Sequence, residues 1–104
     1  MPELTSFSPL SERNAWTTFD AGDNSVGIDP DGYIGGVFDG RYIYLVPWIN
    51  GIEPHGEVLR FDTQETFTNI SSWSAFDPGA NGVSAHTEGY WGGVFDGRYI
   101  YFVP

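Results

Sequence analysis

The sequence contains no cysteine and no lysine, and its only basic residues are four arginines. Without cysteine, disulfide bonds and thiolate chemistry are excluded, and cysteine usage gives no information on the redox compartment. The 14 acidic residues give a formal net charge of −10. This balance argues against nucleic acids and anionic membranes as partners, because both attract basic patches. We therefore interpret the charge as a solvated acidic surface.

Long apolar runs are also absent. None approaches the ~20 residues of a membrane span, so we expect no membrane partner. The first thirteen residues, MPELTSFSPLSER, have neither the basic start nor the apolar stretch of a signal peptide. We expect a chain made in the cytoplasm, and the sequence leaves its final localisation open. With 104 residues the chain forms one domain at most.

Helical patterns are missing as well. No stretch of eleven residues carries apolar side chains at i, i+3, i+4 and i+7, and fourteen glycines and seven prolines interrupt the chain. Short alternating segments instead predict seven strands, five within residues 15–76 and two more in the second copy of the repeated stretch, with a degenerate eighth near Glu3 to Phe7. The five strands are 15–19, 33–38, 42–46, 57–62 and 72–76. We predict an all-β fold.

The chain contains one stretch twice. Residues 32–47 read GYIGGVFDGRYIYLVP and residues 89–104 read GYWGGVFDGRYIYFVP, so fourteen of sixteen positions are identical at an offset of 57 residues. The offset also relates Trp16 to Trp73. Periods of this size are typical of propellers, solenoids or arrays. We divide the chain into a lead-in or degenerate edge strand (1–14), a first repeat (15–71) and a truncated second repeat (72–104).

The strand over residues 42–46 is apolar on both faces (YIYLV), so it needs a neighbour on both faces. Four-stranded antiparallel blades of a β-propeller, each packed between two other blades, meet this demand. The glycine pair Gly35-Gly36 fits the same architecture, because glycine inside a strand indicates close approach of another backbone. We therefore predict propeller blades.

These motifs resemble the kelch repeat: a glycine pair, a DG hairpin with aromatic residues, the strand EVLRFD and the tryptophan strand SWSAFD. The resemblance covers residues 15–104 and implies a four-stranded propeller blade. In this chain the glycine pair precedes the DG hairpin and the period is longer than in kelch repeats.

In each repeat one Asp-Gly turn separates two apolar runs. Asp39-Gly40 and Asp96-Gly97 predict type I′ hairpins, because both turn residues of this type need positive φ. Arg41 and Arg98 follow these turns at equivalent positions. We expect each Asp–Arg pair to form the turn and a cross-blade ion pair rather than a ligand site.

With a period of 57 residues, 104 residues make about two blades, whereas a propeller closes with typically 4–8 blades. The chain begins and ends within a repeat, so we expect copies to complete shared blades and close a symmetric ring. The expected partner is the chain itself, with a homotrimer favoured over a dimer or a tetramer.

Catalysis is not expected. The two histidines, His55 and His86, lie at non-equivalent positions without a serine- or cysteine-based nucleophile pattern beside them. The acidic loop fits no calcium-loop spacing, and its four aspartates are not all kept in the second repeat: Asp20, Asp23, Asp29 and Asp31 correspond to Asp77, Ala80, His86 and Glu88. We therefore expect no metal and no cofactor.

Aromatic side chains near loop ends suggest a second hypothesis, a multivalent carbohydrate-binding module. Trp48, Tyr90 and Trp91 could stack on a sugar ring, with Asn50 and Glu53 as polar partners. The other interpretation is that these rings cap the blade cores. Trp91 replaces Ile34 of the first repeat, which favours the core, whereas Trp48 follows Pro47 in a loop, which favours exposure.

Overall fold

The computed structural model describes all residues, 1–104, and its regular structure consists of β-strands and two short 3₁₀ turns. The strands are β1 (Pro2–Leu4), β2 (Trp16–Thr18), β3 (Tyr33–Phe38), β4 (Tyr42–Pro47), β5 (Ile49–Asn50), β6 (Glu53–Pro54), β7 (Val58–Asp62), β8 (Trp73–Phe76), β9 (Gly92–Phe95) and β10 (Ile100–Val103). The 3₁₀ turns are η1 (Arg13–Ala15) and η2 (Ile70–Ser72). The prediction of an all-β fold is confirmed.

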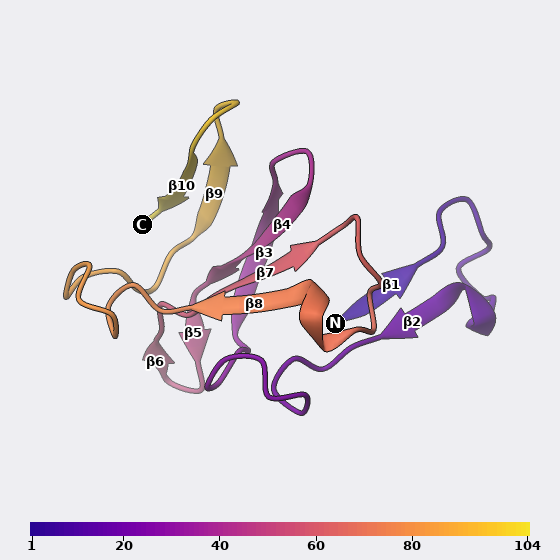
Figure 1. Cartoon of the computed structure of the whole chain (residues 1–104), viewed down its shortest axis with the longest axis horizontal. Helices are drawn as coiled ribbons and strands as arrows, with labels where there is room; N and C mark the ends of the chain where they lie inside the picture. Colours follow the sequence, from indigo (N-terminus) through magenta and orange to yellow (C-terminus); the bar gives the residue numbers. More distant parts are fainter.

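The largest sheet has four antiparallel strands in the order β3-β4-β7-β8. Three two-stranded antiparallel sheets accompany it: β1-β2, β9-β10 and the small hairpin β5-β6. In Figure 1 the β9-β10 pair and the β1-β2 pair lie on opposite sides of the four-stranded sheet. The chain is thus one complete four-stranded sheet flanked by two separate strand pairs.

The two flanking pairs share pairing registers with the two halves of the central sheet. In β1-β2, Leu4 lies opposite Trp16, as Phe61 lies opposite Trp73 in β7-β8. In β9-β10, Ile100 lies opposite Phe95, as Ile43 lies opposite Phe38 in β3-β4. We call β1-β2 the N-terminal pair and β9-β10 the C-terminal pair.

The core lies on one face of the central sheet. The segment that follows β2 packs against β7 and β8, and Phe19 stacks on Trp73 with ring centroids 5.0 Å apart and an interplanar angle of 9°. Seven buried side chains form this core cluster, with Tyr33, Ile43, Leu45 and Ala75 packed around it: Phe19, Ala21, Val26, Leu59, Phe61, Phe67 and Trp73.

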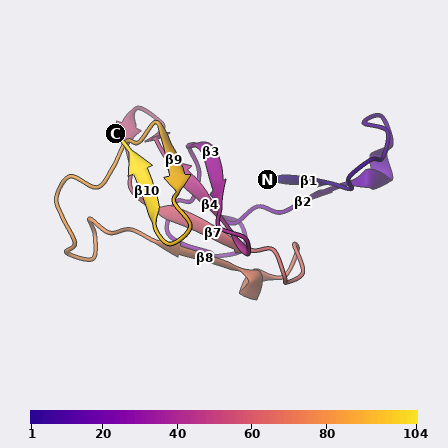
Figure 2. The same cartoon turned by 90° about the horizontal axis from the view of Figure 1, so that it is seen from above.

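The C-terminal pair packs on the opposite face of the central sheet, beside β3 (Figure 2). Val46 of β4 is fully buried, and Val37 of β3 is buried as well. A Cβ on Gly93 would lie 2.6 Å from Cγ2 of Val37, so only glycine allows this approach. The close contact at Gly93 is made by a valine side chain rather than by another backbone, so the predicted approach of a second backbone is not what this glycine accommodates.

Some local predictions were wrong. Residues 15 and 72 belong to 3₁₀ turns that lead into β2 and β8, rather than to the strands themselves. The loop after β4 forms the hairpin β5-β6, which the sequence indicated only as a turn at Asn50-Gly51.

No helix of the structure is long and apolar enough to cross a membrane.

Candidate functional site

The hairpin turns differ from the predicted type I′. Gly40 has φ = 102°, but Asp39 is not among the residues with positive φ. A positive φ at the first central residue alone is the pattern of a type II′ turn with Gly40 and Arg41 at its centre. Asp39 instead accepts hydrogen bonds on Oδ1 from the backbone N–H groups of Arg41 (2.9 Å) and Tyr42 (2.6 Å). The carboxylate, rather than the backbone of Asp39, therefore defines the turn.

The second hairpin repeats this arrangement. Gly97 has φ = 101°, and Asp96 Oδ1 accepts from Arg98 N (2.8 Å) and Tyr99 N (2.7 Å). These backbone hydrogen bonds, supported by the Tyr101 hydroxyl, lower the pKa of Asp96. The pKa of Asp39 is also lowered: burial opposes the shift, and the N–H groups of the turn outweigh it.

The single chain shows no cross-blade ion pair at Arg41. Arg41 pairs instead with Asp62 of β7, with 2.7 Å between Nη2 and Oδ2 and 3.1 Å between Nε and Oδ1. The hydrogen bonds from Arg41 lower the pKa of Asp62. The pair joins adjacent strands of one sheet, β4 and β7, rather than neighbouring blades. Arg98 forms no such pair, because the structure contains this single salt bridge.

Two strand edges that are paired in the central sheet are free in the flanking pairs. In the central sheet β4 pairs with β7, with Ile43 opposite Phe61 and Tyr44 opposite Arg60. Their counterparts are β10 and β1, and each of these pairs only with the other strand of its own hairpin or pair. The chain therefore presents two unsatisfied edges whose repeat equivalents form a ladder with each other.

A groove of about 490 Å³ lies between the outer half of the central sheet and β10. Six of its nine lining residues are hydrophobic. The lining comprises Tyr44, Val58, Arg60, Ser74, Ala75, Phe76, Pro78, Ile100 and Phe102. Phe76 is 54 % exposed there, whereas its repeat equivalent Phe19 is 6 % exposed in the core cluster. The groove is an apolar surface without a protein partner in the single chain.

The aromatic residues considered for sugar binding are only partly brought together. Trp48 and Trp91 lie against each other, with ring centroids 5.3 Å apart and an interplanar angle of 44°. Trp91 is 64 % exposed and Trp48 is half-buried, the reverse of the expectation from their positions in the repeat. Tyr90 packs instead against Phe102, with centroids 5.5 Å apart.

The polar residues assigned to the same site have other positions. Asn50 donates a hydrogen bond from Nδ2 to the carbonyl of Asp29 (3.1 Å), so part of its capacity is used in holding two loops together. Glu53 is exposed on β6. The geometry therefore defines an aromatic pair, Trp48 with Trp91, rather than the full set of five residues.

A buried polar group was missed by the sequence analysis. Glu57 is 8 % exposed and accepts hydrogen bonds from the backbone N–H groups of Ile28 (3.0 Å) and Asp29 (3.1 Å). Burial raises the pKa of Tyr33, and the charge of Glu57 adds to the shift. Glu57 accepts hydrogen bonds from backbone N–H groups of the loop before β3, so its role is structural. A charged residue at the start of a predicted strand gave no signal of this contact.

The acidic loops serve as turns. Asp20 Oδ1 accepts from Asp23 N (3.1 Å), and its repeat equivalent Asp77 accepts from Gly79 N (3.0 Å) and Ala80 N (3.2 Å). Such carboxylate–backbone hydrogen bonds are typical of aspartate in loops. The structure places no three His, Asp or Glu side chains together as a metal-binding group.

No protein-family model matches the chain, and comparison with curated proteins and with solved structures found no significant match. The resemblance to kelch repeats thus remains a prediction. The strand pairs, the groove and the aromatic pair are the features of the molecule that bear on its function.

Proposed function

We propose that the protein is a non-catalytic building unit of a β-propeller, with about two blades per chain, that assembles with copies of itself into a closed ring. The central sheet corresponds to one blade, because it has four antiparallel strands in sequence order. The N-terminal pair corresponds to the outer half of a blade and the C-terminal pair to the inner half, since they share the registers of β7-β8 and β3-β4.

One observation carries the proposal: the two flanking pairs are complementary halves of the same four-stranded sheet. Joining the C-terminal pair of one copy to the N-terminal pair of the next gives a second complete blade. Each interface is then head-to-tail, and the ring closes by rotation. Closure also removes the exposed edge of β10, which as a free edge is an aggregation hazard.

Two blades per chain allow rings of four, six or eight blades, and we favour six, a homotrimer. Size-exclusion chromatography with light scattering should give a mass near three chains at micromolar concentration. A mass near two or four chains would correct the blade number and leave the ring intact. A folded, soluble single chain at that concentration would contradict the proposal.

A second candidate function, multivalent carbohydrate binding, is favoured by the contact between Trp48 and the exposed Trp91. Aromatic rings exposed near loops offer faces for the apolar C–H groups of a sugar. In a ring, one such aromatic pair per chain would give several equivalent sites and hence avidity.

We predict for this second function that Trp48→Ala abolishes any response on a glycan array while the mass of the assembly is unchanged. Ile52→Ala serves as the matched control, because Ile52 is exposed in the β5-β6 hairpin but carries no ring. Binding retained by Trp48→Ala would exclude the aromatic pair as the sugar site. Loss of assembly would instead place Trp48 in the interface between copies.

A further inference from the structure

The core cluster has a second, divided version in the chain. Shifted by the repeat offset, one part of the cluster falls on the groove: Phe19, Ala21, Ile43 and Leu45 correspond to Phe76, Pro78, Ile100 and Phe102, all of which line it. The other part falls on the N-terminal pair and its connection: Leu59, Phe61, Phe67 and Trp73 correspond to Pro2, Leu4, Leu10 and Trp16. The groove therefore has the equivalents of the first part of the core cluster, whereas the equivalents of the second part lie on the N-terminal pair and its connection.

The N-terminal pair already makes the tryptophan hydrogen bond that its counterpart makes in the core cluster. Trp16 donates from Nε1 to the carbonyl of Leu10 over 2.9 Å, as Trp73 donates to the carbonyl of Phe67 over 2.8 Å. Yet Trp16 is 42 % exposed and Trp73 only 5 % exposed. The two equivalent tryptophans make the same hydrogen bond, but only Trp73 is covered by other side chains.

The two parts cannot meet within one copy. Figures 1 and 2 place the N-terminal pair and the C-terminal pair on opposite sides of the central sheet. The first residues are also held there, since the Met1 amino group donates to the carbonyl of Phe19 (2.6 Å) and Phe19 N donates to the carbonyl of Met1 (2.9 Å). The occupant of the groove must therefore come from outside the copy.

We propose that the N-terminal pair of a second copy of this chain fills the groove, with its β1 pairing antiparallel to β10. This inference rests on the ring proposed above and defines its interface. The register follows from β4 and β7: Ile100 lies opposite Leu4 of the second copy, and Tyr101 lies opposite Glu3 of the second copy. Phe76 then stacks on Trp16 of the second copy, as Phe19 stacks on Trp73.

The proposed ladder between β10 and β1 carries different charged residues from its equivalent, the ladder between β4 and β7. Within the central sheet Arg41 pairs with Asp62 and Arg60 lies over Tyr42, 4.2 Å from the ring centroid. At the equivalent positions of the proposed ladder, Asp62 is replaced by Thr5 and Arg60 by Glu3.

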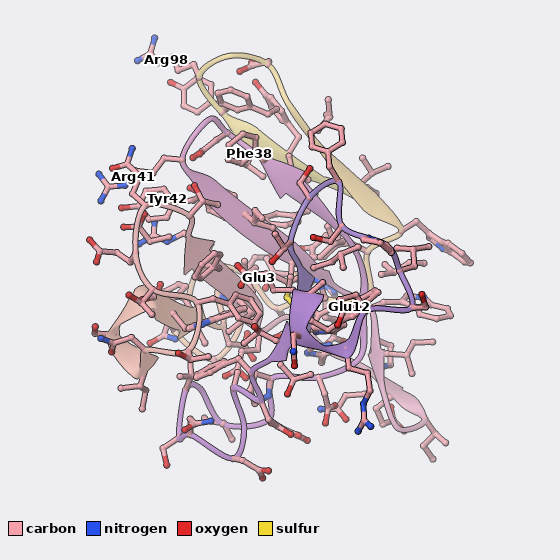
Figure 3. The ribbon with its side chains drawn as sticks, turned by 90° about the vertical axis from the view of Figure 1, so that its right-hand side faces the viewer. Glu3, Glu12, Phe38, Arg41, Tyr42 and Arg98 are labelled. Atoms are coloured by element: carbon pink, nitrogen blue, oxygen red, sulfur yellow. The ribbon has the colours of Figure 1, made fainter.

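Arg98, without a carboxylate partner in its own chain, therefore meets Glu3 of the second copy over the ring of Tyr99. Figure 3 shows Arg98 pointing into solvent at the tip of the β9-β10 hairpin and Glu3 at β1. An opposite-charge pair across the ladder stabilises the pairing of β10 with β1 of a second copy. A strand edge that placed a basic residue beside Arg98 would be destabilised, because like charges across a ladder repel.

The main experiment uses two variants that damage opposite surfaces of the interface. Phe76→Asp places a charge in the groove, and Leu10→Asp places one on the N-terminal pair; both side chains are exposed in the single copy, so the fold should survive. Each variant alone should fall to the mass of one chain. An equimolar mixture retains one intact interface and should give the mass of two chains and no larger species. Ile52→Asp, on the exposed β5-β6 hairpin, should keep the wild-type mass.

The outcomes separate this inference from the proposed function. A wild-type protein that stays a single chain would overturn both. A wild-type ring that Phe76→Asp and Leu10→Asp leave intact would overturn the inference alone. A mixture that remains monomeric would also overturn it, because head-to-tail surfaces must complement each other.

The ion pair is tested by a charge swap. Arg98→Glu should raise the dissociation constant of the interface about 5-fold, the range expected for one exposed pair. Adding Glu3→Arg should restore the wild-type value. The matched control adds Glu53→Arg instead, which produces the same net charge at a position on β6, and should restore nothing. Equal rescue by both double variants would show that only net charge matters and would overturn the assigned pair.

Discussion

At the scale of single residues, Gly40 and Gly97 carry the two hairpins. Both have φ near 100°, and a Cβ at either position would meet no atom within 4 Å. A side chain there would cause backbone strain without any clash, because L-residues avoid this region of φ and β-branched residues avoid it most.

We predict that Gly40→Val lowers the free energy of unfolding by about 1–3 kcal/mol. Gly92→Val is the control, since Gly92 begins a strand, has open space around its Cβ position and has no positive φ. Urea denaturation of dilute protein would measure both. Equal midpoints for the two variants would contradict the assigned turn geometry.

The aspartates of these turns should make stability depend on pH. The folded-state pKa values of Asp39 and Asp96 lie below the ordinary value because turn N–H groups donate to the carboxylates. A depressed folded-state pKa stabilises the fold fully above the unfolded pKa, about 4, and the contribution is lost as the pH falls through the folded pKa. We therefore predict that stability declines below about pH 4.

The double variant Asp39→Asn/Asp96→Asn checks this assignment, because an amide oxygen can still accept the turn hydrogen bonds but does not titrate in this range. Its unfolding midpoint should change less than the wild-type midpoint between pH 6 and pH 3. Parallel curves for the two proteins would assign the acid sensitivity to other carboxylates.

At the scale of elements, the two glycine pairs have different surroundings although their sequences are identical. Gly93 is pressed against Val37 of β3, whereas Gly36 is exposed and a Cβ there would have no atom closer than 3.4 Å. In the proposed ring, the repeat equivalent of the Val37–Gly93 contact would be Val94 of one copy against Gly36 of another. Val94 is exposed in the single chain.

Alanine substitutions should distinguish the packing of Gly93 inside the single chain from the proposed packing of Gly36 between copies. Gly93→Ala should destabilise the single chain by about 1–3 kcal/mol, because it overpacks an internal contact. Gly36→Ala should leave the unfolding of dilute chains nearly unchanged and raise the dissociation constant of the assembly. Measurements of thermal unfolding and of mass against concentration would show both effects. A Gly36→Ala variant that assembles like the wild type would contradict the packing of Val94 on Gly36.

The elements were predictable where a pattern is local. The span of β3 followed from its flanking turn residues, and the four strands of the central sheet followed from short apolar runs between turns. The 3₁₀ turns η1 and η2 were missed because three residues carry no periodicity. The turn type was missed because the Asp39 side chain, rather than positive φ at Asp39, stabilises the hairpin.

Contacts between distant segments were less predictable. Arg41 was expected to form a cross-blade ion pair, yet in the single chain its partner is Asp62, because β4 and β7 are adjacent strands of one sheet. Trp91 was expected in the core from its counterpart Ile34, but it precedes β9 and lies exposed against Trp48. Both errors come from register and packing, which one sequence does not specify.

At the scale of the whole molecule, a single copy buries little. Only 14 of its 104 residues are buried, and Trp16, Phe76, Leu10 and Val83 are exposed although their repeat equivalents are buried. Small cores give marginal stability. Association would extend the core into the groove, and it would couple folding to concentration by mass action.

The charge of the molecule opposes this association. Each copy carries a formal charge of −10, so copies repel each other at long range. The proposed interface, by contrast, is mainly apolar and contains the single proposed Arg98–Glu3 pair. Salt screens repulsion between exposed charges over about 10 Å at 0.1 M ionic strength. It also weakens the exposed ion pair, but that pair is worth at most about 1 kcal/mol.

We therefore predict that raising sodium chloride from about 20 mM to about 500 mM tightens the assembly, because the net repulsion outweighs one exposed pair. Sedimentation velocity at several protein concentrations would give the dissociation constant at each salt level. The Arg98→Glu variant should gain more from salt than the wild type, since its interface adds a local repulsion to the general one. An assembly that dissociates as salt is added would mean that attraction between charges, rather than the filling of the apolar groove, holds the copies together.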